Sequence, residues 1–526
     1  MLLSLASALP APLKHLYGVG ATLVVLGLLT YALPDDWGKN VTALKPWVEG
    51  DAPLYAGFRG IDTRQADKDT GLSEELLAEA GAHPAEAEDA DLVAPPPVVA
   101  KAPPKAPTAA PKRPAAAPAP RPDAPPTPPV AVKPTDDAPA VALDPAEWKG
   151  ISGELEDPSG KALDTFFRAL HRTARREPGA ITRISHWGAS VIAADGFTSV
   201  ARRKLQALFG SGGKGWVNVA PGSKWYRQRD VVYKPRGWKD RMVTFDSLKS
   251  GRYGFGGVAA IGAPGAVSSY QAHATRLELY YLAQPKGGEV ELAVEDGPTQ
   301  VVSTALPDGA AQDAWATLVA PALDPQKPNT FTVKALGKGP VHLYGVTLET
   351  DGPGVVYDCL GLIGTRADRL LHFDETHIAA QVAHRKPDLI VLDFGGNETG
   401  DENMNLRLYE ESYKDVIRRM RKGRPEASCL VLTPVDHAEN DRGKLVTKPI
   451  LRRMLPVMRR LAKDEGCAVF DVWKAMGGEG SLRKWVTNDF AYADSHLTAG
   501  GDRVLGAMLY KAIVKGYSDW RSKASR

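Results

Sequence analysis

The chain has 526 residues, enough for two or three domains. Its 65 basic and 62 acidic residues nearly cancel, so no broad basic excess indicates nucleic acid as a partner. No Cys-x-x-Cys or His-x-x-x-His spacing indicates a metal site, and neither a metal nor an organic cofactor is expected. Each of the three cysteines lies in or beside an apolar run, which favours buried thiols, with one disulfide as the alternative. They are Cys359, Cys429 and Cys467.

An uncharged apolar stretch at residues 16–33 matches the length of about twenty residues that a membrane-spanning helix needs. Lys14 precedes it and Asp35 and Asp36 follow, a bias that places the N-terminus in the cytoplasm. A cleaved signal peptide is the alternative, but no small-x-small cleavage site follows the stretch. Residues 1–34 are therefore expected to form a single anchor in the inner (cytoplasmic) membrane, with the catalytic part in the periplasm or another extracytoplasmic space.

The region after the anchor divides by composition. Residues 35–93 are mixed and become acidic, and their pattern predicts no clear fold. Residues 94–143 are dominated by Pro and Ala, a composition that cannot bury a core and favours extended polyproline conformations. At about 3.1 Å per residue, such a linker can reach on the order of 100 Å. It is expected to act as a tether.

The globular part is expected to begin at residue 144, with a first α/β portion at 144–215. A helix is predicted at 162–174, because its large apolar residues share one face. These residues are Leu163, Phe166, Phe167 and Leu170. A strand at 180–185 and a helix at 191–209 follow. Ser190 lies at the junction of the two, where its hydroxyl is exposed beside the backbone N–H groups of the helix start. His186 and Trp187, just before it, are expected to pack as strand residues.

Residues 216–350 change to short alternating runs between turns, which predicts an inserted β-sandwich. The expected strands are 231–233, 275–282, 289–294, 330–334 and 341–348. Five aromatic residues of this insert could stack on sugar rings, but packing in the core or in the seam to the α/β part is the expected role for each. They are Trp216, Trp225, Tyr226, Tyr233 and Trp238.

The α/β alternation resumes at 351–526. Strands are expected at 355–360, 388–394, 428–433 and 468–472, and helices after Gly364 and at 409–422, 450–464 and 500–517. This repetition predicts a parallel sheet with helices on both faces and with its chemistry at the C-terminal strand ends. His372, His377 and His384 are predicted to lie on a solvated helix face rather than in a metal cluster. Asp436 and His437 follow a strand and could line the pocket, but they are predicted to form a loop pair.

Four short blocks carry the residue types that acyl transfer needs. They are Gly188-Ala-Ser190, Gly361-Leu-Ile-Gly364, Gly395-Gly-Asn397-Glu and Asp494-Ser-His496. A serine hydroxyl becomes nucleophilic when an imidazole takes its proton and a carboxylate orients that imidazole. A glycine in a tight turn frees its N–H, and an asparagine at a strand tip offers a neutral donor, so both suit an oxyanion.

In this order the blocks resemble the SGNH (GDSL-type) hydrolase family, most closely the bacterial envelope branch that acts on O-acetyl groups of peptidoglycan or related glycans. The resemblance covers roughly residues 150–520. It implies a three-layer α/β/α fold, and the insert resembles the carbohydrate-binding-type domain of some peptidoglycan O-acetylesterases. It assigns Ser190 as nucleophile, His496 as base and Asp494 as orienting acid. It assigns the oxyanion hole to the N–H groups of Ser190 and Gly364 and to the Asn397 amide.

The sequence departs from the family pattern in two places. Ala189 replaces the aspartate that usually precedes the nucleophile, and Ala493 stands where an acid usually lies three residues before the histidine. Asp494 is the expected acid if its loop shifts, and the alternatives are another carboxylate or a Ser-His dyad.

The expected function is therefore a membrane-anchored esterase that removes O-acetyl groups from a cell-envelope glycan through an acyl-serine. The alternatives are an O-acetyltransferase that works beside a membrane acyl-donor protein, and a non-catalytic glycan-binding protein.

Overall fold

The computed structural model describes residues 70, 72–81, 141–306, 309–320 and 322–524. The expected anchor at 1–34, most of 35–93 and nearly all of the linker at 94–143 lie outside these residues. Within the described ranges, no helix is both long and apolar enough to cross a membrane.

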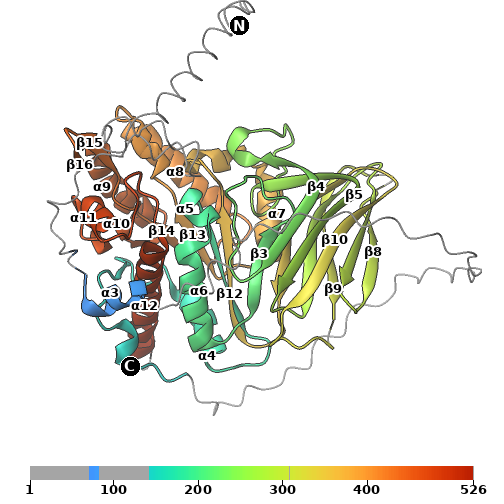
Figure 1. The fold of residues 1–526 in the computed structure, drawn as a ribbon, viewed down its shortest axis with the longest axis horizontal. Helices are drawn as coiled ribbons and strands as arrows, with labels where there is room; N and C mark the ends of the chain where they lie inside the picture. The colour runs from blue at the N-terminus through green and yellow to red at the C-terminus, as the bar shows by residue number, and fades with distance from the viewer. Residues whose placement is uncertain (1–69, 71, 82–140, 307–308, 321, 525–526) are drawn as a thin grey trace, which may run out of the picture. The chain divides into compact units, whose positions relative to one another are not determined.

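A six-stranded sheet forms the centre of the α/β part (Figure 1). Its order is β1 (Leu155–Glu156), β17 (Ala468–Phe470), β14 (Ser428–Leu432), β13 (Leu389–Asp393), β2 (Ile181–Gly188) and β12 (Gly354–Gly361). All neighbouring pairs are parallel except β1 with β17, which is antiparallel at the edge. The expected parallel sheet is confirmed, and β1 was not predicted.

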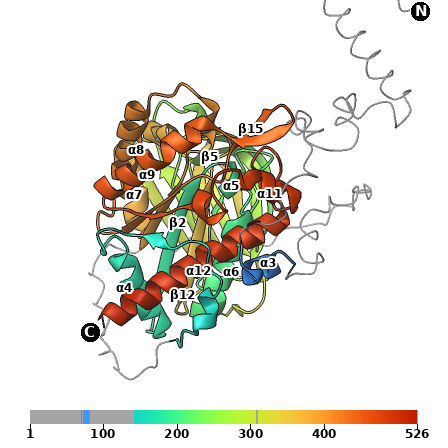
Figure 2. The same cartoon turned by 90° about the vertical axis from the view of Figure 1, so that its left-hand side faces the viewer.

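Side chains of the sheet alternate between two apolar cores. Val391 of β13 packs in one core, and its neighbours Ile390 and Leu392 pack in the other. The first core contains α4 (Asp164–Ala174), α6 (Gly196–Phe209) and α12 (Ala499–Ala524), and Figure 2 shows α12 crossing this face. The second contains α7 (Glu375–Arg385), α8 (Leu406–Arg421) and α9 (Pro449–Asp464). The sheet therefore has helices on both faces, as predicted.

Short elements complete the described chain. α3 (Glu74–Gly81) packs against α12, so part of the region at 35–93 belongs to the globular body. The 3₁₀ turns are η5 (Pro145–Trp148), η6 (Val243–Phe245), η7 (Ala367–His372) and η8 (Asn397–Gly400). The remaining elements are α10 (Val472–Ala475), α11 (Ser481–Thr487), β15 (Ala438–Asp441) and β16 (Lys444–Thr447). The helix expected directly after Gly364 begins with η7 and continues as α7.

The prediction of a single helix at 191–209 is wrong, because the helix is interrupted after one turn. α5 (Ser190–Ala193) ends before Asp195, whose φ of 48° is left-handed, and α6 starts at Gly196. The buried Asp195 carboxylate accepts hydrogen bonds from Arg202 at 3.0 Å and from Lys214 at 2.8 Å. Burial acts to raise the pKa of Asp195, but the two cations lower it overall. This charge cluster stabilises the break between α5 and α6, just after the helical turn that begins with Ser190.

The nine strands of the insert are hydrogen-bonded into one network, and strands from its two parts pack side chains into a single apolar core, as the predicted sandwich requires. Its strands are β3 (Gly213–Asn218), β4 (Val232–Met242), β5 (Val258–Ala272), β6 (Arg276–Ala283), β7 (Glu289–Val294), β8 (Thr299–Ser303), β9 (Gln312–Val319), β10 (Asn329–Gly337) and β11 (Val341–Glu349). β5 pairs with β11 through its first residues and with β10 through its last, so it joins the two parts of the sheet.

The histidine face of α7 is not solvated, contrary to the prediction, because it packs against the insert. His377 is buried, and its Nδ1 lies 2.8 Å from Asp313 of β9. His384 lies 2.9 Å from Glu278 and stacks on Trp315. No group of three or more His, Cys, Asp or Glu residues in the described chain is arranged to hold a metal ion. These polar contacts belong to the seam between the insert and the α/β part.

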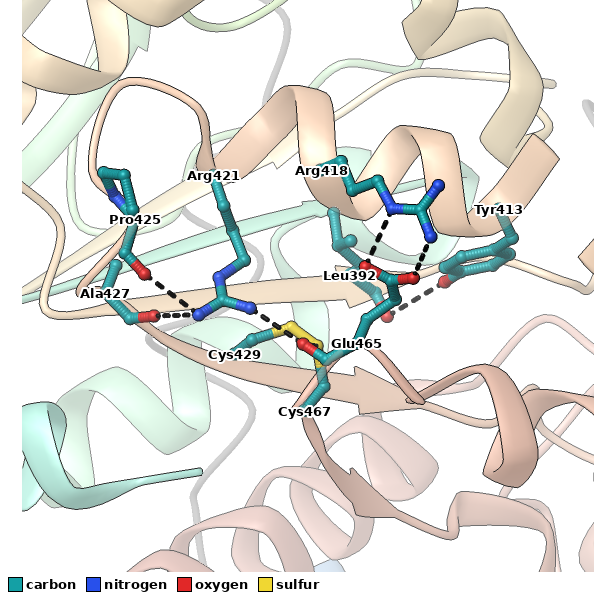
Figure 3. The surroundings of a disulfide bond; sticks show 9 residues. All are labelled: Leu392, Tyr413, Arg418, Arg421, Pro425, Ala427, Cys429, Glu465 and Cys467. Atoms are coloured by element: carbon teal, nitrogen blue, oxygen red, sulfur yellow. Dashed lines mark hydrogen bonds and ion pairs between the residues drawn. A yellow bond between two sulfur atoms is a disulfide. The ribbon is translucent and has the colours of Figure 1, made fainter. Parts of the chain in front are cut away.

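Two of the three cysteines form a disulfide, so the expectation of three thiols is wrong. Cys429 is the second residue of β14 and Cys467 precedes β17, which places them side by side one position before the pair Leu430–Ala468. Arg421 donates hydrogen bonds to the carbonyl groups of Glu465 and Ala427, beside the two cysteines (Figure 3). Cys359 is a buried free thiol.

We expect the disulfide to stabilise the fold, because it closes a loop over a sequence separation of 38 residues. Replacing both Cys429 and Cys467 with alanine should lower the free energy of unfolding by about 2–4 kcal/mol. Urea unfolding of the full chain measures this change. Dithiothreitol should destabilise the parent protein to a similar extent and leave the double variant unchanged. Equal stability of the oxidised parent and the variant would contradict the prediction.

Candidate active site

Three neighbouring strands end at the same level of the sheet. In the parallel register, Gly188 of β2 lies beside Gly361 of β12 and Asp393 of β13. The segments that follow these residues contain Ser190, Gly364 and Asn397. Parallel strands present their C-terminal ends at one rim, so segments distant in sequence meet there.

Ser190 begins α5 directly after β2. The two glycines of the rim allow this helical turn to lie against the sheet. A Cβ at Gly361 would collide with the backbone of Ala193, and a Cβ at Gly188 would collide with the side chain of Ile192. The half-buried Ser190 is thus held at the first turn of α5, where backbone N–H groups are unpaired. His186 and Trp187 are buried in β2, as predicted.

The loop before α12 brings His496 to this serine. Ser190 Oγ lies 2.9 Å from His496 Nε2, across a separation of 306 residues. On the other side of the ring, Nδ1 lies 3.1 Å from Oδ2 of Asp494. The structure therefore brings the predicted hydroxyl, imidazole and carboxylate together in one chain of contacts.

A tight turn explains how Asp494 reaches the ring although it lies only two residues before His496. Ser495 adopts a left-handed φ of 75°, and the backbone N–H of His496 donates a hydrogen bond to Asp494 Oδ1 at 3.2 Å. The backbone N–H of Tyr492 donates to the carbonyl of His496 at 2.7 Å and closes the loop. A left-handed non-glycine residue costs energy and is typical of functional sites.

Asp494 dominates the electrostatics of His496. Its contact raises the pKa of the imidazole, while partial burial of the ring acts in the opposite direction. The Nδ1 atom lies at ion-pair distance from Oδ2, but the pair does not have the direction of a good hydrogen bond. The attraction between the two charges depends mainly on their distance and only weakly on angle. Asp494 is thus placed to stabilise the imidazolium form of His496.

Asn397 offers a donor on the opposite side of the rim. One hydrogen of its side-chain amide is donated to the carbonyl of Thr365 at 2.9 Å, which orients the group. The buried Glu398 accepts hydrogen bonds from the backbone of Gly395 and Ala367, so it links the Asn397 turn to the turn after β12. Burial raises the pKa of Glu398. The second amide hydrogen of Asn397 remains for a substrate oxygen.

The role of Gly364 in the oxyanion hole remains a prediction. It is exposed, and its φ of 68° is left-handed, as expected for a tight turn. It does not belong to the described residues that line the cavity at Ser190.

A cavity of about 260 Å³ opens at Ser190 and includes residues that the sequence did not single out. Its polar wall consists of Ser190, Asp393, Asn397, Thr399, Thr433, His437, Lys448, Asp494, Ser495 and His496. His437 therefore belongs to the cavity wall and not merely to a loop pair, whereas the buried Asp436 binds Thr447 and the backbone of Leu482. The position of His437 after strand β14, at the same rim, is the signal that indicated this alternative.

Comparisons with known proteins agree with this arrangement. Residues 331–504 match the family model of the GDSL-like Lipase/Acylhydrolase family, a range that contains Gly364, Asn397 and His496 but not Ser190. No curated protein matches the chain.

A solved structure of similar fold is a peptidoglycan O-acetylesterase. It superposes with a TM-score of 0.59 and 23% identity, and the match covers 69% of this chain and 99% of that chain. A family two carbohydrate esterase with a carbohydrate-binding domain from Corynascus thermopiles (Myceliophthora fergusii) gives a TM-score of 0.25 at 12% identity, covering 54% and 99%. An acetyl xylan esterase gives 0.24 at 19% identity, covering 30% and 80%. Only the first superposes well enough to support a shared fold.

Replacing Asp494 with asparagine should slow ester hydrolysis and move its pH dependence. His496 must be unprotonated to accept the serine proton, and Asp494 raises its pKa, so activity should fall as the pH drops through a value above the ordinary 6.5. Without the carboxylate, the pKa of His496 falls and the acid limb should move to lower pH. The rate should fall by about a hundredfold or more, as for other triads that lose this acid.

The pH profile of kcat/KM with 4-nitrophenyl acetate measures both effects. Asp489→Asn is the matched control, since this exposed carboxylate lies in the same loop region but does not contact the ring. An unchanged acid limb in Asp494→Asn would exclude Asp494 as the partner of His496.

Proposed function

Because the chain carries a GDSL-like lipase/acylhydrolase domain and is an esterase-type enzyme, we propose that it removes O-acetyl groups from a cell-envelope glycan, with peptidoglycan as the leading substrate. The observation that carries this proposal is the contact chain Ser190–His496–Asp494, with distances of 2.9 and 3.1 Å at one cavity. The fold shared with a peptidoglycan O-acetylesterase supports the choice of glycan.

In the proposed reaction, His496 Nε2 takes the proton of Ser190 as Oγ attacks the acetyl carbonyl carbon. The carbonyl oxygen becomes an oxyanion, which the Ser190 backbone N–H and the free amide hydrogen of Asn397 stabilise. The intermediate collapses, and the sugar oxygen leaves with the proton from His496. A water molecule, deprotonated by the same imidazole, then attacks acetyl-Ser190 and releases acetate. Asp494 stabilises the imidazolium form of His496 both during acylation of Ser190 and during hydrolysis of acetyl-Ser190.

Exposed aromatic residues beside the site favour a sugar polymer over a small ester. Thr244 of the insert contacts Thr365, whose carbonyl holds Asn397, and the next residue, Phe245, has 71% of its surface exposed. Trp225 lies two residues before Arg227, whose backbone N–H donates to the carbonyl of Ala193 in α5. Trp225 has 51% of its surface exposed, whereas Trp216 and Tyr226 are buried. Aromatic rings offer flat apolar faces that sugars can cover. These two residues are therefore candidates for contact with the glycan outside the cavity.

Replacing Ser190 with alanine should abolish release of acetate from O-acetylated peptidoglycan, because no other group forms the acyl-enzyme. The expected loss is about a thousandfold or more, as for other serine triads. Acetate assayed from the full-length protein and its variant measures this. Ser223→Ala, a change in the insert outside the cavity wall, is the control. Full acetate release by Ser190→Ala would contradict the role of Ser190 as nucleophile. No release by the parent protein, together with glycan binding that survives Ser190→Ala, would favour the non-catalytic glycan-binding alternative.

The same assay separates hydrolysis from transfer. If the protein is an esterase, added chito-oligosaccharide should leave free acetate as the product. If it is an O-acetyltransferase working beside a membrane acyl donor, acetylated oligosaccharide should form instead, as mass spectrometry would detect. Both reactions pass through acetyl-Ser190.

We also propose that the enzyme acts outside the cytoplasm, anchored by residues 1–34. Two observations support this: the uncharged stretch at 16–33, and the disulfide Cys429–Cys467, since such bonds persist mainly in oxidising compartments. The full-length protein should fractionate with membranes and be degraded by protease added to spheroplasts. Removal of residues 1–34 should release it from the membrane fraction. Protection from external protease would contradict the proposed orientation.

A further inference from the structure

A small hairpin, absent from the sequence-based prediction, contributes two side chains to the cavity of Ser190. β15 and β16 pair antiparallel after the C-terminal end of β14. The residues that flank the hairpin are His437 and Lys448, and the backbone N–H of Lys448 donates to the carbonyl of His437 at 2.8 Å. Both residues line the cavity. They therefore lie side by side on its wall.

His437 presents a fixed hydrogen-bond acceptor. Its Nδ1 lies 2.9 Å from the carbonyl oxygen of Val435, which can only accept, so Nδ1 carries the hydrogen. Burial lowers the pKa of His437 to about 4, so the ring is neutral at pH 7 and Nε2 keeps its lone pair. Nε2 faces Gly396, next to the donor Asn397, and no described residue donates a hydrogen bond to it.

Lys448 brings a positive charge that no described carboxylate neutralises at ion-pair distance. Its Nζ is half-buried and lies 3.4 Å from the carbonyl oxygen of Thr399. The two acids of the cavity wall have other neighbours: Asp494 contacts His496, and Asp393 lies 3.7 Å from Nε2 of the buried His186. A cation in a cavity that must hold substrate suits an anionic group of that substrate.

We infer that His437 and Lys448 form a subsite for the sugar that bears the ester, in which Lys448 binds a carboxylate of that sugar and His437 accepts a hydrogen bond from its hydroxyl or amide N–H. The inference rests on the proposed function and restricts the class of glycan that the enzyme accepts. The substrate is an acidic acetylated glycan rather than a neutral one such as acetylated xylan.

The test uses two acetylated sugars that differ in the carboxylate. 6-O-acetyl-N-acetylmuramic acid carries a lactyl carboxylate, and 6-O-acetyl-N-acetylglucosamine lacks it. The full-length protein should show a kcat/KM about tenfold or more higher for the acid, the range expected for one charge-assisted hydrogen bond. Lys448→Met should bring the ratio of the two values close to one, and Lys448→Arg should keep most of it. Lys444→Met, an exposed lysine of the same hairpin, is the matched control and should leave the ratio unchanged.

His437→Phe should raise KM several-fold for both sugars, because the donor that His437 recognises is common to them, and His437→Gln, which keeps an acceptor, should recover part of the loss. An unchanged KM in His437→Phe would remove His437 from the subsite. Equal kcat/KM values in the parent protein, or a preference that survives Lys448→Met, would overturn the inference and leave the esterase proposal intact.

Titration of Ser190→Ala with both sugars makes the inference independent of activity. If neither sugar is hydrolysed by the parent protein, the esterase proposal fails for these substrates. Tighter binding of the acid that Lys448→Met abolishes would then still support the subsite, and equal binding of the two sugars would overturn it.

Discussion

The whole site depends on the register of three adjacent parallel strands. β12, β2 and β13 end level with one another at Gly361, Gly188 and Asp393, so the segments that follow them converge at one rim. A shift of one residue would reverse the faces of the side chains along a strand and expose its apolar core. The burial of both sheet faces therefore fixes the register, and the register fixes the distance from the Ser190 turn to the Asn397 turn.

The loop before α12 shows how a shortened motif can retain its geometry. With Asp494 two residues before His496, an extended chain would point both side chains to the same side but hold their Cα atoms about 6.6 Å apart. The left-handed Ser495 turns the chain back locally, so Nδ1 of His496 and Oδ2 of Asp494 lie 3.1 Å apart. The loop stores strain that the surrounding contacts must offset.

The insert packs against the elements that carry the site and does not stand apart as a separate module. Trp187 of β2 donates to the carbonyl of Phe255, His377 of α7 contacts Asp313, and Thr244 contacts Thr365 beside the Asn397 turn. These buried contacts couple the β region to the turn that orients Asn397. The shared fold with a peptidoglycan O-acetylesterase covers 69% of the chain, more than the α/β part alone can supply.

The sequence alone determined the local features: the apolar faces of α4, the β-rich insert, the strand ends that hold Ser190 and Asn397, and the types of residue needed for acyl transfer. These follow from periodicity and from short motifs. The tertiary structure decided what depends on pairing between distant strands and loops. The disulfide Cys429–Cys467 exists because β14 and β17 are neighbours, and His377 of α7 is buried because β9 covers it. Likewise, His437 and Lys448 reach the cavity because a hairpin follows β14, and no local pattern records which distant surface a residue will meet.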